Sequence, residues 1–466
     1  MGINSEPIRD ELARVVSGPV TSDPEALRRF RQDASTFVGE PLAAVAPRDT
    51  QEVVALVRWA RQRRVALVGR GGGTSLDGES VPPDGSVVVD FSGWTQLVEL
   101  DTENRLVRVG PGLVNRELHR QLIPNRLFFP PNPGSWTSST IGGNVATNAS
   151  GMRSFRYGPT RSWVRGLEAV LGTGEILRLG HRARKSSTGP GLLGFLVGSE
   201  GTLGLFTEVT LGLAPLPEER IGIVAPIRSE GQLPDLLQRL LGAPELGLAA
   251  VEYLDAATAS ALADEPGVRL PRGVPLLLLE VECSTSRRDA AIERTYQLLE
   301  MEGSAAAAEV FPSADELWTL RGRSSDAISR THGTRLREDV AVPLSRIPEM
   351  LREIREISTS TGVEVYLYGH LGDGSLHPNF AVDPGSALGQ NIRRRLLFAS
   401  RRMGGTISAE HGIGKAKAPF LTLEHGSSGV ALLKRIKQAC DPDGILNPGK
   451  LYPEEGATAT GEPSAP

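Results

Sequence analysis

Two histidines flank a short turn in the segment 368–380, YGHLGDGSLHPNF. The dipeptide Asp373-Gly374 is typical of a two-residue hairpin loop. Such a loop places His370 opposite His377 on one face of the hairpin, with Cβ atoms about 5 Å apart. That spacing can hold one metal ion, and Glu410, in the distant segment SAEHGIGK, can supply a carboxylate. Two imidazoles and one carboxylate suit Zn²⁺, Mn²⁺ or Fe²⁺; the alternative is that both histidines only bond neighbouring backbone.

A second chemical signal is glycine, which is concentrated in a few loops. The first loop, Arg70–Ser75 (RGGGTS), directly follows an apolar, strand-like run. Three consecutive glycines expose several backbone N–H groups with no side chain in the way, and the hydroxyls of Thr74 and Ser75 add donors. This loop suits a pyrophosphate; the alternative is an ordinary flexible loop.

A longer glycine-rich stretch covers residues 130–158, PPNPGSWTSSTIGGNVATNASGMRSFRYG. Small residues allow the backbone to lie against a flat ring system, and amide and N–H groups can bond the carbonyls of the ring. Loops of this length are uncommon unless they are functional or disordered. We therefore favour a ring-binding role over a plain surface loop, and the run VGSEGT (197–202) fits the same pattern.

Three familiar loop motifs are excluded at single positions. A Rossmann GxGxxG fingerprint needs glycine at 74 or 76, where Thr74 and Leu76 stand. A P-loop ending in Gly414-Lys415 needs glycine at 409, which is Ala409. The run 197–201 is one glycine short of a nucleophile elbow. Nicotinamide binding by a Rossmann fold, P-loop chemistry and serine hydrolysis are therefore not expected.

The composition excludes further classes. A net charge of -4 over 466 residues gives no sign of nucleic-acid binding. There is no run of about 20 apolar residues and no apolar region at the N-terminus, so neither a transmembrane helix nor a signal peptide is expected. Cys283 and Cys440 form no CxxC, so neither a redox dithiol nor an iron–sulfur cluster is expected. We expect a cytoplasmic protein, with peripheral contact at the inner membrane left open.

The elements that position these groups follow from the hydrophobic pattern. Short Val/Leu-rich runs alternate with glycine turns up to about residue 215, which predicts an α+β unit. A second unit with strands and amphipathic helices starts near Glu218. The clearest predicted strands are Val87–Asp90, Leu106–Val109, Leu167–Leu171 and Thr207–Leu213. In the second unit, Ile221–Pro226 and Leu276–Val281 are predicted strands, and Leu233–Leu241 and Arg287–Met301 are predicted amphipathic helices. The expected divisions are a helical segment 1–38, a cofactor domain 39–217, a substrate domain 218–404, a segment 405–453 returning to the cofactor domain, and a disordered tail 454–466.

The glycine-rich segments together resemble the FAD-binding domain of the vanillyl-alcohol-oxidase-like flavoproteins, the type 4 FAD-linked oxidases. The resemblance covers roughly residues 40–453 and ends at ILNPGKLYP (445–453). It implies an α+β fold with a two-subdomain PCMH-type FAD-binding domain and an α+β substrate (cap) domain with an antiparallel sheet. No histidine lies between 66 and 118, so non-covalent FAD is expected. The FAD-binding residues that the resemblance implies are Arg70, Gly71, Gly72, Gly73, Thr74, Ser75, Pro133, Gly134, Thr140, Gly142, Gly143, Asn144, Asn148, Gly151, Tyr157, Gly158, Thr160, Glu200, Gly201 and Asn447.

The histidine segments resemble the D-2-hydroxy acid dehydrogenase branch of this family. The resemblance implies a divalent metal held by His370, His377 and Glu410. It also implies substrate contact through Asn379 and a base at His411. Ser375 departs from the usual Asn, which leaves one hydrogen bond near the site unsupported.

The segment 317–343 carries the substrate-binding arginines that the resemblance implies. The resemblance implies that Arg321, which follows LWTL, binds the substrate carboxylate. The alternative is that Arg321 and Arg323 lie on a solvated helix face. Arg337 stands where the family has Lys, with the spacing offset by one, and Ser325 matches a family Thr. Arginine suits bidentate carboxylate binding.

These residues imply an FAD-dependent oxidation of a D-2-hydroxy acid of the D-lactate or D-2-hydroxyglutarate class, with hydride passing to flavin N5 and assistance from the metal. An external electron acceptor is implied: an electron-transfer flavoprotein, a cytochrome or a quinone. The alternatives are the flavin subunit of a glycolate oxidase complex, which activity of the isolated chain would discriminate, and a non-redox flavoprotein like alkylglycerone phosphate synthase, which a triple-His run would favour. A pure binding module is a third. The sequence leaves open the acid, the acceptor, the metal, the oligomeric state and whether the chain acts alone.

Overall fold

The computed structural model describes residues 5–300, 308–311 and 313–453. By their internal contacts these residues divide into two compact units. Unit 1 comprises the described residues up to Ser150, Gly158–Leu216 and those from Glu410 onward, and unit 2 comprises Gly151–Tyr157 and those from Pro217 to Ala409. Helices and sheets occur in both units, so the predicted α+β class is confirmed. The expected disordered tail, 454–466, lies outside the described residues.

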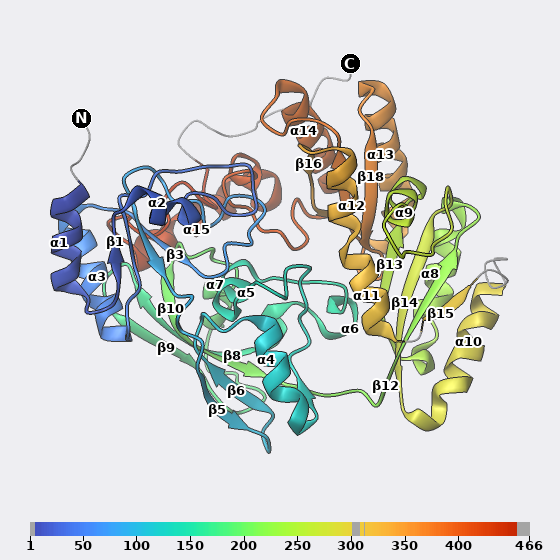
Figure 1. Cartoon of the computed structure of the whole chain (residues 1–466), viewed down its shortest axis with the longest axis horizontal. Helices are drawn as coiled ribbons and strands as arrows, with labels where there is room; N and C mark the ends of the chain where they lie inside the picture. The colour runs from blue at the N-terminus through green and yellow to red at the C-terminus, as the bar shows by residue number, and fades with distance from the viewer. Residues whose placement is uncertain (1–4, 301–307, 312, 454–466) are drawn as a thin grey trace. The chain divides into compact units, whose positions relative to one another are not determined.

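The first sheet of unit 1 is largely parallel (Figure 1). Strands β2 (Ala43–Val45), β4 (Val87–Asp90) and β3 (Leu67–Arg70) pair in parallel, and β1 (Val20–Thr21) adds to β2 in antiparallel direction. Every residue of β4 is buried, as expected of an apolar strand at the centre of a parallel sheet. Helix α3 (Thr50–Arg63) begins after Asp49, whose carboxylate accepts the amide of Glu52, and its apolar face completes the core of this sheet.

The second sheet of unit 1 is antiparallel. Its order is β5 (Leu97–Asp101), β6 (Leu106–Val109), β10 (Gly204–Gly212), β8 (Val164–Leu171) and β9 (Ile176–Gly180). A small separate pair is formed by β7 (Leu127–Phe128) and β11 (Ala214–Pro215). The predicted strands at 87–90 and 106–109 are confirmed with their bounds.

The remaining helices of unit 1 connect these strands or cover them. They are α1 (Ser5–Val15), α2 (Pro24–Leu27), α4 (Asn115–Leu122), α5 (Ile141–Thr147), α7 (Leu193–Leu196) and α15 (Leu421–Cys440). The last residues of unit 1 return to its first sheet: the amide of Leu67 donates to the carbonyl of Ile445, and the amide of Asn447 donates to the carbonyl of Leu67. Ile445 and Leu446 are buried in the core of that sheet.

Unit 2 is built on one antiparallel sheet (Figure 1). Its order is β15 (Glu309–Phe311), β12 (Glu219–Pro226), β14 (Leu276–Cys283), β13 (Leu248–Leu254), β18 (Val365–His370), β19 (Ser375–Phe380) and β16 (Leu336–Arg337), while β17 (Val340–Ala341) also pairs with β19. The antiparallel sheet expected for the second domain is therefore present.

Helices pack on this sheet and on one another. They are α6 (Ser154–Tyr157), α8 (Leu233–Leu241), α9 (Ala256–Ala263), α10 (Arg288–Glu300), α11 (Ala314–Gly322), α12 (Ser324–Thr331), α13 (Ile347–Thr361) and α14 (Ala387–Arg402). The bounds of α8 match the prediction. Helix α11 contacts β12 and brings Leu317 and Trp318 into the unit 2 core. Among the described residues, we find no helix with the length and apolar character needed to cross a membrane.

Candidate active site

The predicted register of the histidine hairpin is wrong by two residues. His377 lies opposite Tyr368 rather than His370, so the connection between β18 and β19 is longer than two residues. Asp373 shapes this loop, because its carboxylate accepts the amide and hydroxyl of Ser375 at 3.1 Å and 2.7 Å. A shift of two positions keeps both side chains on one face of the sheet. The two imidazoles are diagonal neighbours, and their ring centroids are 5.0 Å apart.

Glu252 lies beside His370 at the centre of the sheet of unit 2. It pairs with His370 across β13 and β18, and its Oε1 lies 2.5 Å from Nδ1 of His370. Its Oε2 accepts the Nε–H of Arg321 at 3.1 Å. Burial alone raises the pKa of Glu252, but the interactions with His370 and Arg321 outweigh it, and the pKa is below its ordinary value. The sequence analysis missed this residue; the signal was a single acid in the otherwise uncharged strand LAAVEYL.

Arg321 is buried beside Glu252 and does not lie on a solvated helix face. Its side chain is only 9% exposed, whereas that of Arg323 is 37% exposed and pairs with Glu265. The guanidinium of Arg321 lies over the ring of Tyr368, with 4.4 Å between its carbon and the ring centroid. This stacking fixes the plane of the guanidinium.

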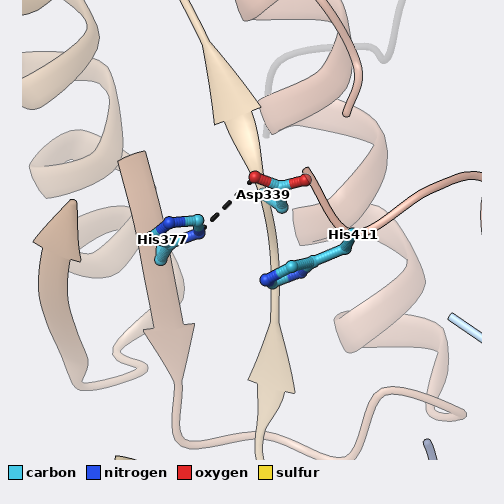
Figure 2. Close-up of side chains that lie close together, drawn as sticks. All are labelled: Asp339, His377 and His411. Atoms are coloured by element: carbon cyan, nitrogen blue, oxygen red, sulfur yellow. Dashed lines mark ion pairs between the residues drawn. The ribbon is translucent and has the colours of Figure 1, made fainter. Parts of the chain in front are cut away.

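Asp339 is the corresponding neighbour of His377 (Figure 2). Its Oδ1 lies 3.5 Å from Nδ1 of His377, and its Oδ2 accepts the hydroxyl of Ser408 at 3.0 Å and the amide of Ala409 at 2.9 Å. The chain continues directly from Ala409 into Glu410 and His411. Asp339 therefore anchors the segment that carries two of the predicted site residues, although the sequence analysis did not name it.

Two groups of side chains have the geometry of a metal site. His370, His377 and Glu410 form one group, and Asp339, His377 and His411 form the other; within each, the ligand atoms lie within 4.8 Å of one another. Figure 2 shows the second group, with the ion pair between Asp339 and His377. Asp339 already accepts hydrogen bonds from Ser408 and Ala409, so it suits a residue that orients His377 without contacting a metal. The first group, His370, His377 and Glu410, then has the donors for a divalent ion.

Asn379, which the resemblance implies as a substrate contact, bonds Arg335, an arginine that the sequence analysis did not name. The side-chain oxygen of Asn379 accepts the Nε–H of Arg335 at 2.9 Å, and Asn379 Nδ2 donates to the carbonyl of His377. Arg335 also donates to the hydroxyl of Ser325 at 2.7 Å and is buried. Arg337 is the backbone partner of Asn379 across β16 and β19 and is half-buried.

The triple-glycine loop is packed against the segment 138–140. A Cβ on Gly71 would lie 2.1 Å from Oγ1 of Thr140, and a Cβ on Gly72 would lie 2.3 Å from the carbonyl oxygen of Ser138. Gly73 has φ +63, a conformation that favours glycine. The glycines thus allow two of the predicted FAD-binding segments to approach each other. The side chain of Arg70 bonds within the protein, because its Nη2 donates to the carbonyls of Arg29 and Gln32.

Unsatisfied buried polar atoms lie in the same part of unit 1. Among the described residues, Nδ2 of Asn144, Oγ of Ser139 and Oδ1 of Asn447 have no hydrogen-bond partner. Asn144 is 2% exposed. A buried polar group without a partner costs about 1–3 kcal/mol, so these residues fit a polar cofactor such as FAD, which would supply the missing partners.

Several other predicted FAD-binding side chains bond within the chain. Thr140 caps α5 by accepting the amide of Gly143, and Thr160 donates to the carbonyl of Ala149. Tyr157 belongs to unit 2 and donates to Glu282 at 2.5 Å. Of the rest, Pro133 and Gly151 are buried, Gly134 is exposed, and Thr74, Ser75, Gly142, Asn148, Gly158 and Gly201 are half-buried.

Glu200 and Asn447 hold the turn that follows His411. The two oxygens of Glu200 accept the amides of Ile413 and Gly414 at 2.7 Å and 2.9 Å. Asn447 Nδ2 donates to the carbonyls of Glu79 and Glu200. Burial raises the pKa of Glu200 to about 7, although the two amides lower it. Both residues therefore have a structural role next to the segment Glu410-His411.

Comparisons with known proteins concern the family of the chain. Residues 41–180 match a family model described as an FAD binding domain, and residues 216–451 match one described as FAD linked oxidases, C-terminal domain. The glycolate oxidase subunit GlcD of Bacillus subtilis is 33% identical over 96% of this chain and 97% of its own length. The D-2-hydroxyglutarate dehydrogenase of Stutzerimonas stutzeri is 33% identical over 95% of this chain and 98% of its own.

The fold also occurs among solved structures. The 4-ethylphenol oxidase from Gulosibacter chungangensis superposes with a TM-score of 0.78 over 97% of this chain and 99% of its own, at 20% sequence identity. At that identity the likeness concerns the fold alone. It agrees with the PCMH-type fold that the glycine-rich segments predicted.

Proposed function

Because the chain belongs to the family of FAD-linked oxidases, we propose that it is an FAD-dependent dehydrogenase that oxidises a D-2-hydroxy acid to the 2-oxo acid. The substrate is of the D-lactate or D-2-hydroxyglutarate class. The observation that carries the proposal is a group of two imidazoles and a carboxylate, from His370, His377 and Glu410. The buried Arg321 is linked to His370 through Glu252. This set has the donors for a metal ion and an anchor for a carboxylate.

The proposed division of labour follows the units. Unit 1, with the loop 71–75 and the segment 138–148, binds FAD without a covalent link, and unit 2 binds the acid. When bound, FAD accepts a hydride at N5 and a divalent metal such as Zn²⁺, Mn²⁺ or Fe²⁺ supplies Lewis acidity. His370, His377 and Glu410 hold the metal. The electrons then leave to an external acceptor: an electron-transfer flavoprotein, a cytochrome or a quinone.

The remaining residues orient the acid and move its proton. Arg321 presents the terminal N–H groups that Glu252 leaves unused, and these bind the substrate carboxylate. His411 takes the hydroxyl proton, with Glu410 Oε1 3.8 Å from its Nε2. Asn379 contacts the substrate, and Arg337 supplies a second cation for an acid with a distal carboxylate.

A second candidate is supported by the similarity to GlcD. In that case the chain is the flavin subunit of a glycolate oxidase complex, and the isolated chain reduces its flavin with glycolate in preference to chiral D-acids. Both candidates share the site and differ in substrate and in partner subunits.

Anaerobic stopped-flow absorbance of the purified yellow protein tests the proposal. The flavin band is followed as D-lactate, D-2-hydroxyglutarate, glycolate and the L-forms of the chiral acids are added, before and after EDTA treatment. We expect rapid bleaching with one D-acid, loss of bleaching with EDTA and recovery with Zn²⁺ or Mn²⁺. A yellow protein that no hydroxy acid reduces would contradict the substrate class, and bleaching only by glycolate would favour the second candidate.

A further inference from the structure

We propose that Glu252 is a positioning residue that holds the metal ligand His370 and the carboxylate anchor Arg321 as one unit. The inference rests on the proposed function, which assigns those two roles. It concerns only residues of unit 2, and it starts from one carboxylate whose two oxygens have different partners.

The contact with His370 determines which ring nitrogen faces a metal. An ionised carboxylate only accepts hydrogen bonds, so the nitrogen that it contacts, Nδ1 of His370, carries the hydrogen. The lone pair is then on Nε2, the ring nitrogen that Glu252 does not contact. Carboxylate contacts of this kind orient ligating histidines, and their loss typically weakens metal binding 10- to 100-fold.

The contact with Arg321 orients the other functional group. Nε of Arg321 donates to Glu252 at 3.1 Å, while the ring of Tyr368 covers one face of the guanidinium. Neither contact uses the two terminal nitrogens of the guanidinium. These two nitrogens form a planar fork that can bind an external carboxylate bidentately. Glu252 therefore orients both the guanidinium of Arg321 and the imidazole of His370.

The position of Glu252 argues against a role in packing alone. It is 0% exposed, and all residues of β13 are buried. An apolar residue there would fill the strand at no electrostatic cost, because burying a charged pair is often no more stabilising than burying apolar residues of the same volume. A simple counter-ion of Arg321 would need one oxygen only, whereas Glu252 uses both.

The test is Mn²⁺ binding to the FAD-loaded protein after removal of divalent metals, with free Mn²⁺ followed by electron paramagnetic resonance. Glu252→Gln keeps the shape and removes the charge, and we expect Mn²⁺ to bind 10- to 100-fold more weakly. Glu252→Asp keeps the charge on a shorter side chain, so we expect an intermediate loss. The matched control is Glu364→Gln, because Glu364 binds Nε2 of His332 at 2.9 Å on the surface, and its variant should bind Mn²⁺ as the wild type does.

Thermal unfolding of each metal-free variant and the KM for the D-acid complete the experiment. If Glu252→Gln does not fold, the loss of Mn²⁺ affinity in Glu252→Asp decides. Unchanged Mn²⁺ affinity in a folded Glu252 variant overturns the proposal, and so does a rise in KM alone, which would make Glu252 a partner of Arg321 only. Failure of the wild type itself to bind Mn²⁺ would overturn the metal site of the proposed function, and this inference with it. Mn²⁺ binding without flavin reduction by any acid would overturn the proposed reaction and leave the Glu252 arrangement supported.

Discussion

The substitution Arg321→Lys tests the assignment of the carboxylate anchor. Lysine keeps the positive charge but lacks the planar fork, so one of the two bonds to a substrate carboxylate is lost. A hydrogen bond between charged groups contributes about 1.5–3 kcal/mol, which corresponds to a fall in kcat/KM of about 10- to 150-fold. The loss should appear mainly as a higher KM, because the carboxylate is bound in the ground state and in the transition state alike.

The control for this prediction lies two residues further along the chain. Arg323 is more exposed and binds Glu265 at 3.0 Å, and surface ion pairs contribute about 0–1 kcal/mol. Arg323→Lys should therefore leave steady-state kinetics with the D-acid and an artificial electron acceptor unchanged within about twofold. An unchanged KM in Arg321→Lys, or equal effects of the two substitutions, would refute the anchoring role.

Three further predictions concern stability and local order. Burial raises the pKa of Glu200 from 4.5 to about 7, so its contribution to stability is present below pH 4.5 and is lost as the pH rises through about 7. The free energy of unfolding in urea should therefore be about 3 kcal/mol lower at pH 8 than at pH 4, and Glu200→Gln should remove this difference. Gly72→Ala places a Cβ 2.3 Å from the carbonyl of Ser138 and should lower both FAD occupancy and Tm, whereas Gly93→Ala, with open space around it, should change neither. Asp339→Asn should speed amide hydrogen exchange about tenfold in the segment 408–411, which the Asp339 carboxylate anchors, since about 1.4 kcal/mol of charged hydrogen bonding is lost; unchanged exchange would contradict that role.

Local patterns in the sequence predicted several of the regular elements. Strands such as Val87–Asp90 and the helix Leu233–Leu241 have the predicted bounds, because their apolar periodicity and their end signals coincide. The hairpin register was wrong for a local reason as well as a distant one. Asp373 bonds Ser375 within the loop, and the amide of Val342 donates to the carbonyl of Gly374, a contact that the turn dipeptide cannot reveal.

The three proposed metal ligands could be selected from the sequence, but the residues that contact them could not. His370, His377 and Glu410 stand in spaced motifs, and their potential ligand atoms lie within 4.8 Å of one another. Glu252 lies in a segment without a motif, and Arg335 lies two residues before Arg337, the arginine that the motif indicated. Strand pairing links Glu252 to His370, and a side-chain contact links Arg335 to Asn379. Sequence spacing reports local geometry, whereas such contacts depend on the tertiary fold.

The order in which unit 1 is assembled has a consequence for synthesis of the chain. In its first sheet the amide of Leu67 donates to the carbonyl of Ile445, and the core of that sheet includes Leu446. One edge of the sheet is therefore completed by residues that are synthesised almost 400 positions after Leu67. During translation unit 2 can form its sheet from residues 217–409 while unit 1 still lacks that edge. A chain that is interrupted after residue 409 would retain the residues of the unit 2 sheet, but the core of the first sheet of unit 1 would lack Ile445 and Leu446.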